Sequence, residues 1–589
     1  MHYLIDELTT EMGKAFETAG YDPALGRVQV SARPDLAQYQ CNGAMAGAKK
    51  YHKAPFVIAQ DVANALQASD ILENVQVVKP GFINCDVNTE FLTGYIREME
   101  ASDHFGLETG DPKTVIIDYG GPNVAKPLHV GHLRSAVIGD SIKRIMRYHG
   151  DTVIGDIHLG DWGLQMGLVI TELKKRHPEL PYFDPNFTGE YPAEAPFTVS
   201  DLEEIYPFAS KRSKEDKEYY AEALENTHRL QEKERGLYAL WQKIIDVSVA
   251  DLKKNYARLD VTFDLWNGES TVNDLIPGMV DRLKKEGYAY ESEGALVVDV
   301  AEDSDAKEIP PCMILKSDGA ALYTTTDLAT IEDREARYNP DAIVYVTDKR
   351  QELHFIQVFR AAKKCHLADE NCTLSHVGFG TVNGKDGHAF KTREGGVMRL
   401  ETLITDIDQA MYDKIKANPD IPEDEAKTTA HQVALAAIKY GDLQNQPAKD
   451  YIFDTEKFTS FEGNTGPYLL YTMVRIKSIL HRYAESEGAK DVAKLKVASP
   501  ISKAQTNLML DLSGFNAMMD EAYRDFAPNR VCAFLYQAAN DFNSFYHETK
   551  ILAEPDVQKK ESYIALLKVT LDIFEACTAV LGFTAPERM

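Results

Sequence analysis

The stretch TVIIDYGGPNVAKPLHVGHLRSAVIGD, residues 114–140, decides the fold of this chain. Residues 114–120 are rich in Val and Ile and end in glycines, which predicts a buried strand. A helix is predicted from about Gly131 to Tyr148, and the run DTVIGDIH (151–158) predicts a second strand. Because a strand, a helix and a strand in close succession form a βαβ unit, the sequence indicates a parallel sheet.

The predicted sheet is interrupted by a long insertion. Further strand signals come at ALVVDV (295–300), DAIVYVTD (341–348) and SHVGFGTV (375–382), and we expect these strands to continue the parallel sheet. Residues 177–200 are dense in Pro and aromatic residues, which predicts an irregular segment. Ser200 and Glu203 have the spacing of a capping box, which predicts the start of a long charged helix.

Four units are expected along the 589 residues. The amino end combines helical periodicity with short β-type runs at 74–78 and 81–86, and apolar residues from Thr459 to Met589 recur at helical spacing. The expected fold is a multidomain α/β protein with a small α+β domain (1–110), a parallel-sheet domain (111–400, insertion at about 177–300), a helical connecting region (401–458) and an α-helical bundle (459–589).

The composition is acidic, since 64 Lys and Arg against 91 Asp and Glu give a net charge of −27. This charge repels nucleic acid at long range and argues against a generic polyanion binder, but it says nothing about local patches. Residues 113–176 carry nine cations against six acids, and residues 463–483 carry three cations and no acid. We therefore predict a basic track linking these two segments on an otherwise acidic body.

No segment predicts export or a membrane span. Residues 1–20 lack the basic start and apolar run of a signal peptide, and no stretch approaches the ~20 apolar residues that cross a bilayer. The seven cysteines include no C-x-x-C pair, which favours reduced, packed thiols over a disulfide framework or a structural zinc site. We expect a cytoplasmic protein with no membrane partner.

The turn after the first predicted strand has the features of a nucleotide site. Helix N-termini offer free N–H groups to phosphate, and Gly131 would let a nucleotide approach the backbone closely. His129 and His132 are three residues apart, so both can face one ligand and donate to an α-phosphate during nucleotidyl transfer. The alternative is that one histidine only caps the helix and the other packs.

The element H-V-G-H (129–132) resembles the HIGH signature of class I aminoacyl-tRNA synthetases, and PNVAKPLHVGHLRS (122–135) resembles the arginine–tRNA ligase family in particular. Further elements agree in order along nearly the whole chain: YQCNGAMAGAKK (39–50), PGFIN (80–84), HLGDWG (158–163), FDLWNGES (263–270), YTTTDLA (323–329), GFGTVNGKDG (378–387), SFEGNTGPYLLY (460–471) and APERM (585–589).

The resemblance implies the reaction and its partners. Arginine and ATP would form arginyl-adenylate and pyrophosphate, and arginine would then pass to the 3′ end of its tRNA, with bound tRNA required for activation. It also implies a Rossmann-type catalytic core and a monomer. We expect ATP with Mg²⁺ as the cofactor, without zinc or an organic prosthetic group.

The second class I signature, a K-M-S-K-S loop, is replaced here by GHAFKTREGG (387–396). His388 stands at the first lysine position, Lys391 matches the second, and Arg393 is nearby. We expect Lys391 to neutralise pyrophosphate, with Lys126 supplying a second positive charge. The alternative for Lys391 is an ordinary solvated surface lysine.

Arginine recognition needs a carboxylate, because a guanidinium is a planar, charged fork of donors. Tyr323 and Asp327 are four residues apart and would share one helical face, and the resemblance places arginine-side-chain recognition there. An alternative for Asp327 is a helix N-cap. Glu269 is a further candidate for a second carboxylate. The resemblance places Asn123 and Gln351 at the backbone end of arginine and Asp118 near its charged groups.

The resemblance also implies tRNA contacts at both ends of the chain. Tyr468 and Tyr471 are spaced to share a helical face beside cations, which suits unstacked bases of an anticodon loop. Further expected contacts are Arg475, Tyr546 and Met589 in the C-terminal unit, and Phe82 and Asn84 on the D-loop in the N-terminal unit. The alternatives are aromatic residues in a helical core and an ordinary strand with alternating faces.

Two other interpretations of the whole chain stay open. One is another class I ligase or a small HxGH nucleotidyltransferase, against which the helical C-terminal unit and the Tyr323/Asp327 pair argue. The other is a catalytically silent tRNA-binding protein, against which the retained His129, His132 and Lys391 argue.

Overall fold

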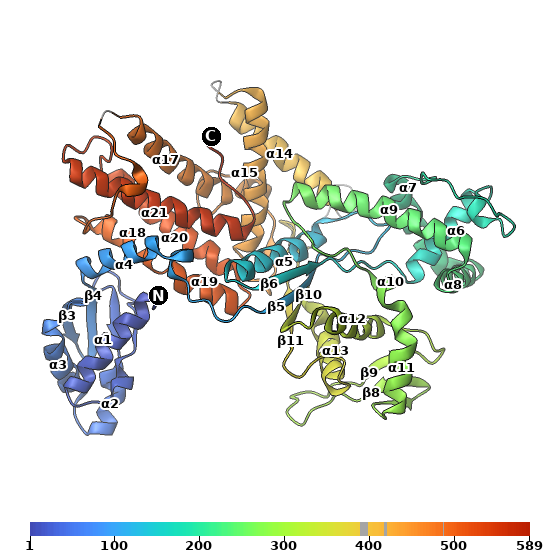
Figure 1. The fold of residues 1–589 in the computed structure, drawn as a ribbon, viewed down its shortest axis with the longest axis horizontal. Coiled ribbons are helices and arrows are strands. Elements are labelled where there is room, and N and C mark those ends of the chain that lie inside the picture. Colours follow the sequence, from blue (N-terminus) through green and yellow to red (C-terminus); the bar gives the residue numbers. More distant parts are fainter. Residues whose placement is uncertain (389–397, 418–420, 487) are drawn as a thin grey trace.

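The computed structural model describes residues 1–388, 398–417, 421–486 and 488–589. Figure 1 shows an N-terminal domain at one end, a central parallel sheet, and C-terminal helices that lie along one side of it. The helical insertion extends at the end of the molecule opposite the N-terminal domain.

The N-terminal domain is an α+β unit. Its four-stranded antiparallel sheet has the order β1-β2-β4-β3, with strands Val28–Val30, Tyr39–Cys41, Phe82–Val87 and Leu72–Val78. Helices α1 (Leu4–Thr18), α2 (Gly43–Tyr51), α3 (Pro55–Ala65) and α4 (Thr89–Ala101) complete this part of the chain. The β-type runs predicted at 74–78 and 81–86 are therefore strands of one sheet.

The central sheet is parallel, as predicted. Its strand order is β11-β10-β5-β6, with strands Thr373–Phe379, Ala342–Asp348, Thr114–Tyr119 and Thr152–Asp156. Helix α5 (Val130–Tyr148) connects β5 to β6, and α13 (Glu352–Lys364) connects β10 to β11. Because these connections run outward from the adjacent strands β5 and β10, a crevice is expected at the carboxyl ends of that pair.

The strand predicted at 295–300 does not join the parallel sheet. It forms β8 (Ala295–Val298), which pairs antiparallel with β7 (Ala289–Ser292) and β9 (Cys312–Leu315). Glu293 and Gly294 both have positive φ, which is the backbone of a tight hairpin turn. The short apolar run alone is compatible with either kind of sheet, so this part of the prediction is wrong.

The insertion is mostly helical after an irregular stretch. Helix α6 (Leu164–Arg176) precedes it, and the insertion comprises α7 (Val199–Glu215), α8 (Lys217–Gln231) and α9 (Arg235–Arg258), followed by α10 (Glu269–Val272) and α11 (Ile276–Lys285). The capping box of helix α7 is formed by Thr198 and Asp201, two residues before the predicted pair, and each side chain accepts from the backbone N–H of the other residue. Glu203 instead forms an ion pair with Arg399 at 2.7 Å.

The C-terminal third is helical, as predicted. Its elements are α14 (Leu400–Lys416), α15 (Glu423–Leu443), α16 (Thr455–Phe458), α17 (Gly466–Ala484), α18 (Lys503–Ser513), α19 (Phe515–Arg524), α20 (Pro528–Glu548) and α21 (Val557–Leu581). All seven cysteines are buried, in agreement with a packing role. Across the described parts of the chain, no helix combines the length and apolar character that crossing a membrane requires.

Within residues 113–176, the predicted basic track does not take the expected form. Seven of the nine cations in 113–176 are ion-paired: Arg134, Lys143, Arg144, Arg147, Lys174, Lys175 and Arg176. Arg134 and Lys143 are also buried, each only 1% exposed. The local excess of cations therefore neutralises acids brought close by folding, so it does not amount to free surface charge.

Candidate active site

A cavity of about 840 Å³ opens at the carboxyl ends of β5 and β10, where the strand order predicts a crevice. Its walls come from the turn after β5, the first turn of α5, the start of α12 (Tyr323–Tyr338) and the segment after β10. The cavity brings together nine of the residues singled out in the sequence: Asp118, Asn123, His129, Gly131, His132, Glu269, Tyr323, Asp327 and Gln351.

The two histidines are held by the start of α5 in one defined tautomer. The Nδ1 atom of His129, the N-cap residue, accepts from the Gly131 N–H at 3.0 Å. The Nδ1 atom of His132 accepts from the His129 N–H at 3.1 Å. Since both Nδ1 atoms are acceptors, each neutral ring carries its proton on Nε2. His129 does cap the helix, and capping leaves its Nε2–H available as a donor.

Both rings are neutral near pH 7. Burial lowers the pKa of His132 to about 3, helped by the neighbouring His129 and Lys126. Burial and Lys126 also lower the pKa of His129. The ring centroids are 3.9 Å apart, so two uncharged donors lie side by side on the wall of the cavity.

Gly131 is required by the position of the His129 ring. A Cβ atom built on Gly131 would lie 2.7 Å from Cε1 and 2.8 Å from Nδ1 of His129. These distances are shorter than real Cβ contacts, so any side chain here would displace the imidazole. The glycine in the H-V-G-H element therefore serves the histidine as well as a close ligand approach.

The predicted cations are placed less directly. The Nζ atom of Lys126 lies 4.3 Å from the ring centre of Tyr206 on α7, and Lys126 is not among the residues that line the cavity. Lys391 and Arg393 lie outside the described residues. Their role on pyrophosphate stays a prediction.

The Tyr323/Asp327 pair is at the start of α12, as the spacing suggested. The N-cap of this helix is Leu322, whose N–H donates to the Thr325 hydroxyl, so the alternative of Asp327 as the cap is wrong. The Oδ2 atom of Asp327 instead accepts from Nε2 of His354 at 2.6 Å. Tyr323 is 68% exposed at the cavity mouth.

Glu269 lies in the same cavity at the start of α10. Burial raises the pKa of Glu269 to about 7, and the nearby carboxylates of Asp161 and Asp327 add to the shift. A guanidinium bound beside Glu269 and Asp327 would relieve this repulsion, because opposite charge favours the ionised carboxylate.

Asp118 is engaged by an arginine of the chain itself. The Nη2 atom of Arg334 donates to Asp118 at 2.6 Å and to Asp156 at 2.8 Å, and Arg334 is buried. Ligand-type atoms of Asp118, Asp156 and His158 lie within 4.8 Å of one another, but the guanidinium already neutralises this group. We therefore do not assign a metal to it.

Three functional residues were not predicted from the sequence: Arg334, His354 and Arg134. Arg134 lines the cavity and contacts Asp442 across the fold. A helical-face argument would have found Arg334, because it lies seven residues after Asp327 on the same helix.

The segment at Asn123 is fixed by a backbone bond from Val124 to Gly160 at 3.0 Å. Gln351 ends the short turn that precedes α13.

Relatives of known identity match the chain over its full length. Proteins named arginine–tRNA ligase from Agathobacter rectalis and Alkaliphilus oremlandii are 56% and 55% identical to it, and each match covers 100% of both chains. The chain belongs to the arginine–tRNA ligase family. A relative of the same name from Francisella tularensis is 45% identical over 99% of each chain.

Three family models match successive parts of the chain. An arginyl-tRNA synthetase N-terminal domain matches residues 3–87, a class I tRNA synthetase (R) catalytic domain 96–455, and a DALR anticodon-binding domain 469–589. The fold resembles arginyl-tRNA synthetases from Plasmodium falciparum (TM-score 0.81, 24% identity, 100% of both chains) and Thermus thermophilus (TM-score 0.75, 23% identity, 99% and 100% coverage).

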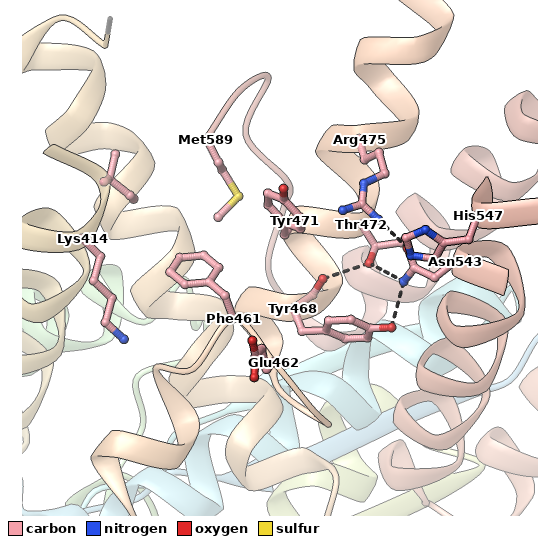
Figure 2. A pocket seen from close by; sticks show the side chains of 11 residues that line it. Lys414, Phe461, Glu462, Tyr468, Tyr471, Thr472, Arg475, Asn543, His547 and Met589 are labelled. Atoms are coloured by element: carbon pink, nitrogen blue, oxygen red, sulfur yellow. Dashed lines mark hydrogen bonds between the residues drawn. The ribbon is translucent and has the colours of Figure 1, made fainter. Parts of the chain in front are cut away.

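A second cavity, of about 670 Å³, lies between the segment that matches the DALR domain and residues that precede it, Lys414, Ile415, Phe461, Glu462 and Tyr468 (Figure 2). Tyr468, Tyr471 and Arg475 of α17 line it together with the terminal Met589. The Tyr468 hydroxyl is bonded to Asn540 and Asn543 at 2.8 Å each, so its ring is held in place. The cavity therefore collects four of the predicted tRNA-contact residues from both ends of the C-terminal unit.

The Arg475 guanidinium lies against two aromatic rings. It is 4.9 Å from the ring centres of both Tyr471 and Tyr546, and its Nη1 donates to Asn543 at 2.7 Å. Tyr471 is 44% exposed, which leaves part of its ring free for another planar group. Tyr546 is not among the residues that line the cavity, so it supports Arg475 from behind.

Phe82 and Asn84 lie two residues apart on β4 of the N-terminal domain. Asn84 is only 4% exposed, and its Oδ1 atom accepts from Gln40 of the neighbouring strand at 2.9 Å. Phe82 is half-buried at the strand end. Their contact with the D-loop stays a prediction, and the more accessible partner of the two is Phe82.

Proposed function

We propose that this chain is an arginine–tRNA ligase that joins L-arginine to its tRNA at the expense of ATP, forming AMP and pyrophosphate. One observation carries the proposal: two neutral histidine Nε2–H donors share a cavity with the carboxylates of Asp327 and Glu269. The donors suit a phosphate that gains charge, and the carboxylates suit a guanidinium.

In the first step, an oxygen of the arginine carboxylate attacks the α-phosphorus of ATP. A new P–O bond forms, the bond to the β-phosphate oxygen breaks, and pyrophosphate leaves with that electron pair. Negative charge grows on the α-phosphate oxygens, where His129 and His132 donate from Nε2. One preorganised donor of this kind contributes roughly 10²–10³ in rate.

Arginine would be selected by charge and shape together. Asp327 and Glu269 accept from the guanidinium, Tyr323 covers it at the cavity mouth, and Asn123 and Gln351 hold the backbone end. Asp118 acts through its ion pair with Arg334, which limits the net negative charge of the cavity floor. Lysine offers a single ammonium group and would leave buried acceptors unpaired, so it is rejected without a separate editing site.

The phosphates of ATP need further cations. We infer that Lys391 and Arg393 neutralise pyrophosphate, that Lys126 contributes from the α7 side, and that Mg²⁺ arrives on the ATP phosphates. Bound Mg²⁺ would supply charge neutralisation of the leaving group. In the second step, a terminal ribose hydroxyl of tRNA attacks the adenylate carbonyl, and AMP leaves.

tRNA would be held by both terminal units of a cytoplasmic monomer. We assign the D-loop to residues 1–110 through Phe82 and Asn84, and the anticodon loop to residues 459–589 through the cavity of Figure 2. The catalytic unit spans 111–400 and the connecting helices 401–458. The exposed Tyr471 ring beside Arg475 suits the stacking of an unpaired base. The family resemblance implies that bound tRNA is required for activation, and we carry that expectation over to this chain.

The test is ATP–pyrophosphate exchange with each of the twenty amino acids, with and without tRNA for arginine. We expect exchange with arginine and with no other amino acid, and only when tRNA is present. Exchange with a different amino acid, or none with any, would overturn the proposal. Arginine-dependent exchange without tRNA would overturn only the tRNA requirement.

A further inference from the structure

Arg134 joins three separate parts of the chain beneath the active site. It lies on α5 two residues after His132 and is 1% exposed. Its Nε donates to Asp442 Oδ2 of α15 at 3.1 Å, and its Nη1 donates to the carbonyls of Gly380 and Lys449 at 2.9 Å each. One guanidinium thus connects the histidine-bearing helix to two loops and to the C-terminal helices.

The Gly380 contact fixes a wall of the cavity. Gly380, Thr381 and Val382 line the same cavity as the first turn of α5. Gly380 itself packs against the backbone of the other loop, because a Cβ built there would lie 2.5 Å from the Lys449 carbonyl carbon. The short strands β12 (Val382–Asn383) and β13 (Tyr451–Ile452) then pair in parallel. Backbone and Asp450 bonds tie this wall to the loop at 447–451, and the Arg134 bond to the Gly380 carbonyl ties it to α5.

The same helix also fixes the chain that follows residues 389–397. The Val130 N–H donates to the Met398 carbonyl at 3.0 Å, and the Leu400 N–H donates to the Leu128 carbonyl at 2.9 Å. The described residues on both sides of 389–397 are thus attached to the start of α5. The upstream attachment runs through the Arg134 side chain, whereas the downstream one uses only backbone groups.

The junction demands an arginine. Its Nε and Nη1 atoms together reach one carboxylate and two carbonyls, while its buried Nη2 has no hydrogen-bond partner among the described residues, and the guanidinium lies 5.0 Å from the ring centre of Tyr451. The Tyr451 hydroxyl in turn donates to Asp442 Oδ2 at 2.8 Å, and Asp442 is fully buried. A lysine ammonium keeps the charge but lacks the planar fork, so it cannot hold both carbonyls and the carboxylate together.

We propose that Arg134 is a positioning residue for amino-acid activation, which holds the Gly380–Val382 wall at the correct distance from the histidine pair. The inference rests on the proposed function, because it names a residue that serves the same reaction. Arg134 acts through the segments that it holds together, α5 and the Gly380–Val382 wall. The step that it supports is the reaction of arginine with ATP. Small misplacement of reacting groups costs up to about 100-fold in rate, which sets the scale of the effect.

The test compares Arg134→Lys with wild type in tRNA-supported ATP–pyrophosphate exchange, with active sites counted by titration. The matched control is Arg144→Lys, since Arg144 lies on the same helix and pairs with Asp140 and Asp260 away from the cavity. We expect Arg134→Lys to lower kcat per active site about 10- to 100-fold and to raise KM for ATP, with KM for arginine within twofold of wild type. Arg144→Lys should match wild type.

Several results would overturn the inference. A merely structural role would lower Tm and the number of active sites without changing kcat per site or KM for ATP. If Arg134→Lys does not fold, Asp442→Asn is tested in its place, because it keeps the shape of the partner side chain. It must lower kcat and raise KM for ATP while KM for arginine stays within twofold of wild type. A wild-type protein without arginine-dependent exchange would reject the proposed function itself, which is a different failure.

Discussion

His354 donates a hydrogen bond from Nε2 to Oδ2 of Asp327 over 2.6 Å, and both residues line the active-site cavity. They come from α13 and α12, on opposite sides of β10 in the sequence. The bond fixes the plane of the carboxylate that we assign to the arginine side chain. A bidentate contact with a guanidinium depends on that plane.

His354→Ala should therefore weaken arginine binding through Asp327. A hydrogen bond to a charged group contributes about 1.5–3 kcal/mol, so KM for arginine should rise about 10- to 100-fold while KM for ATP changes little. His354→Gln retains a donor and should restore part of the loss. The control is His228→Ala, an exposed histidine on α8 that pairs with Glu232. Equal effects on both substrates would contradict this role.

Asp327→Ala should have a larger effect of the same kind. Removing one partner of a buried charge pair costs about 2–5 kcal/mol, which corresponds to at least a 30-fold rise in KM for arginine. Steady-state exchange at varied arginine and varied ATP measures the difference. Asp333→Asn on the same helix, whose partner is Arg337, serves as the control. No change in the arginine KM would exclude Asp327 from side-chain recognition.

Arginine binding should depend on pH through Glu269, whose pKa burial raises to about 7. Below that pH the carboxyl is neutral and attracts the guanidinium weakly, and above it the carboxylate is ionised and attracts it strongly. KM for arginine should therefore fall about tenfold between pH 6 and pH 8 and then level off.

Glu269→Gln should remove this pH dependence and hold KM at the high value. Glu291→Gln, a change at an exposed glutamate on β7, should leave the profile unchanged. A wild-type KM that is flat across this range, or that rises with pH, would show that Glu269 does not contact arginine.

Gly131→Ala should lower kcat for activation about 100-fold or more, because the new Cβ would push the His129 ring out of position. The matched control is Gly94→Ala on α4, where a Cβ would meet no atom within 4 Å. Near-wild-type kcat for Gly131→Ala, with His129→Ala strongly impaired, would mean that the ring tolerates displacement.

Tyr471→Ala should raise KM for tRNA without changing exchange at saturating tRNA. Stacking of one base on an aromatic ring contributes about 1–3 kcal/mol, which predicts a rise of about 5- to 150-fold. Tyr290→Ala removes a similarly exposed tyrosine from β7 and should be neutral. Unchanged tRNA affinity would assign Tyr471 to the packing of the helical bundle.

The features that could be predicted from the sequence are local ones. The β5–α5–β6 unit follows from a short apolar run, two glycines and a helical pattern, all within residues 114–158. The His129/His132 pair follows for the same reason, since a spacing of three at a helix start brings two side chains together whatever else surrounds them. A spacing of four residues on α12 likewise places Tyr323 near Asp327.

Other features could not be predicted because the local pattern suits more than one structure, and contacts outside the pattern decide between them. An apolar run such as 295–298 suits either kind of sheet, and the neighbouring hairpin turn decided for an antiparallel one. Thr198 and Ser200 both suit a helix cap, and contacts elsewhere decided between them. Cation counts in 113–176 suggested a basic surface, but most of those cations meet acids from distant segments.

The sequence by itself determined the sheet unit, the histidine pair and the family, because short-range geometry and motif order carry that information. Only the tertiary structure decided how the site is held. Asp118 meets Arg334 across 216 residues, and Arg134 meets Asp442 across 308. A buried charge needs a partner wherever the fold provides one, and no local spacing specifies which residue that will be.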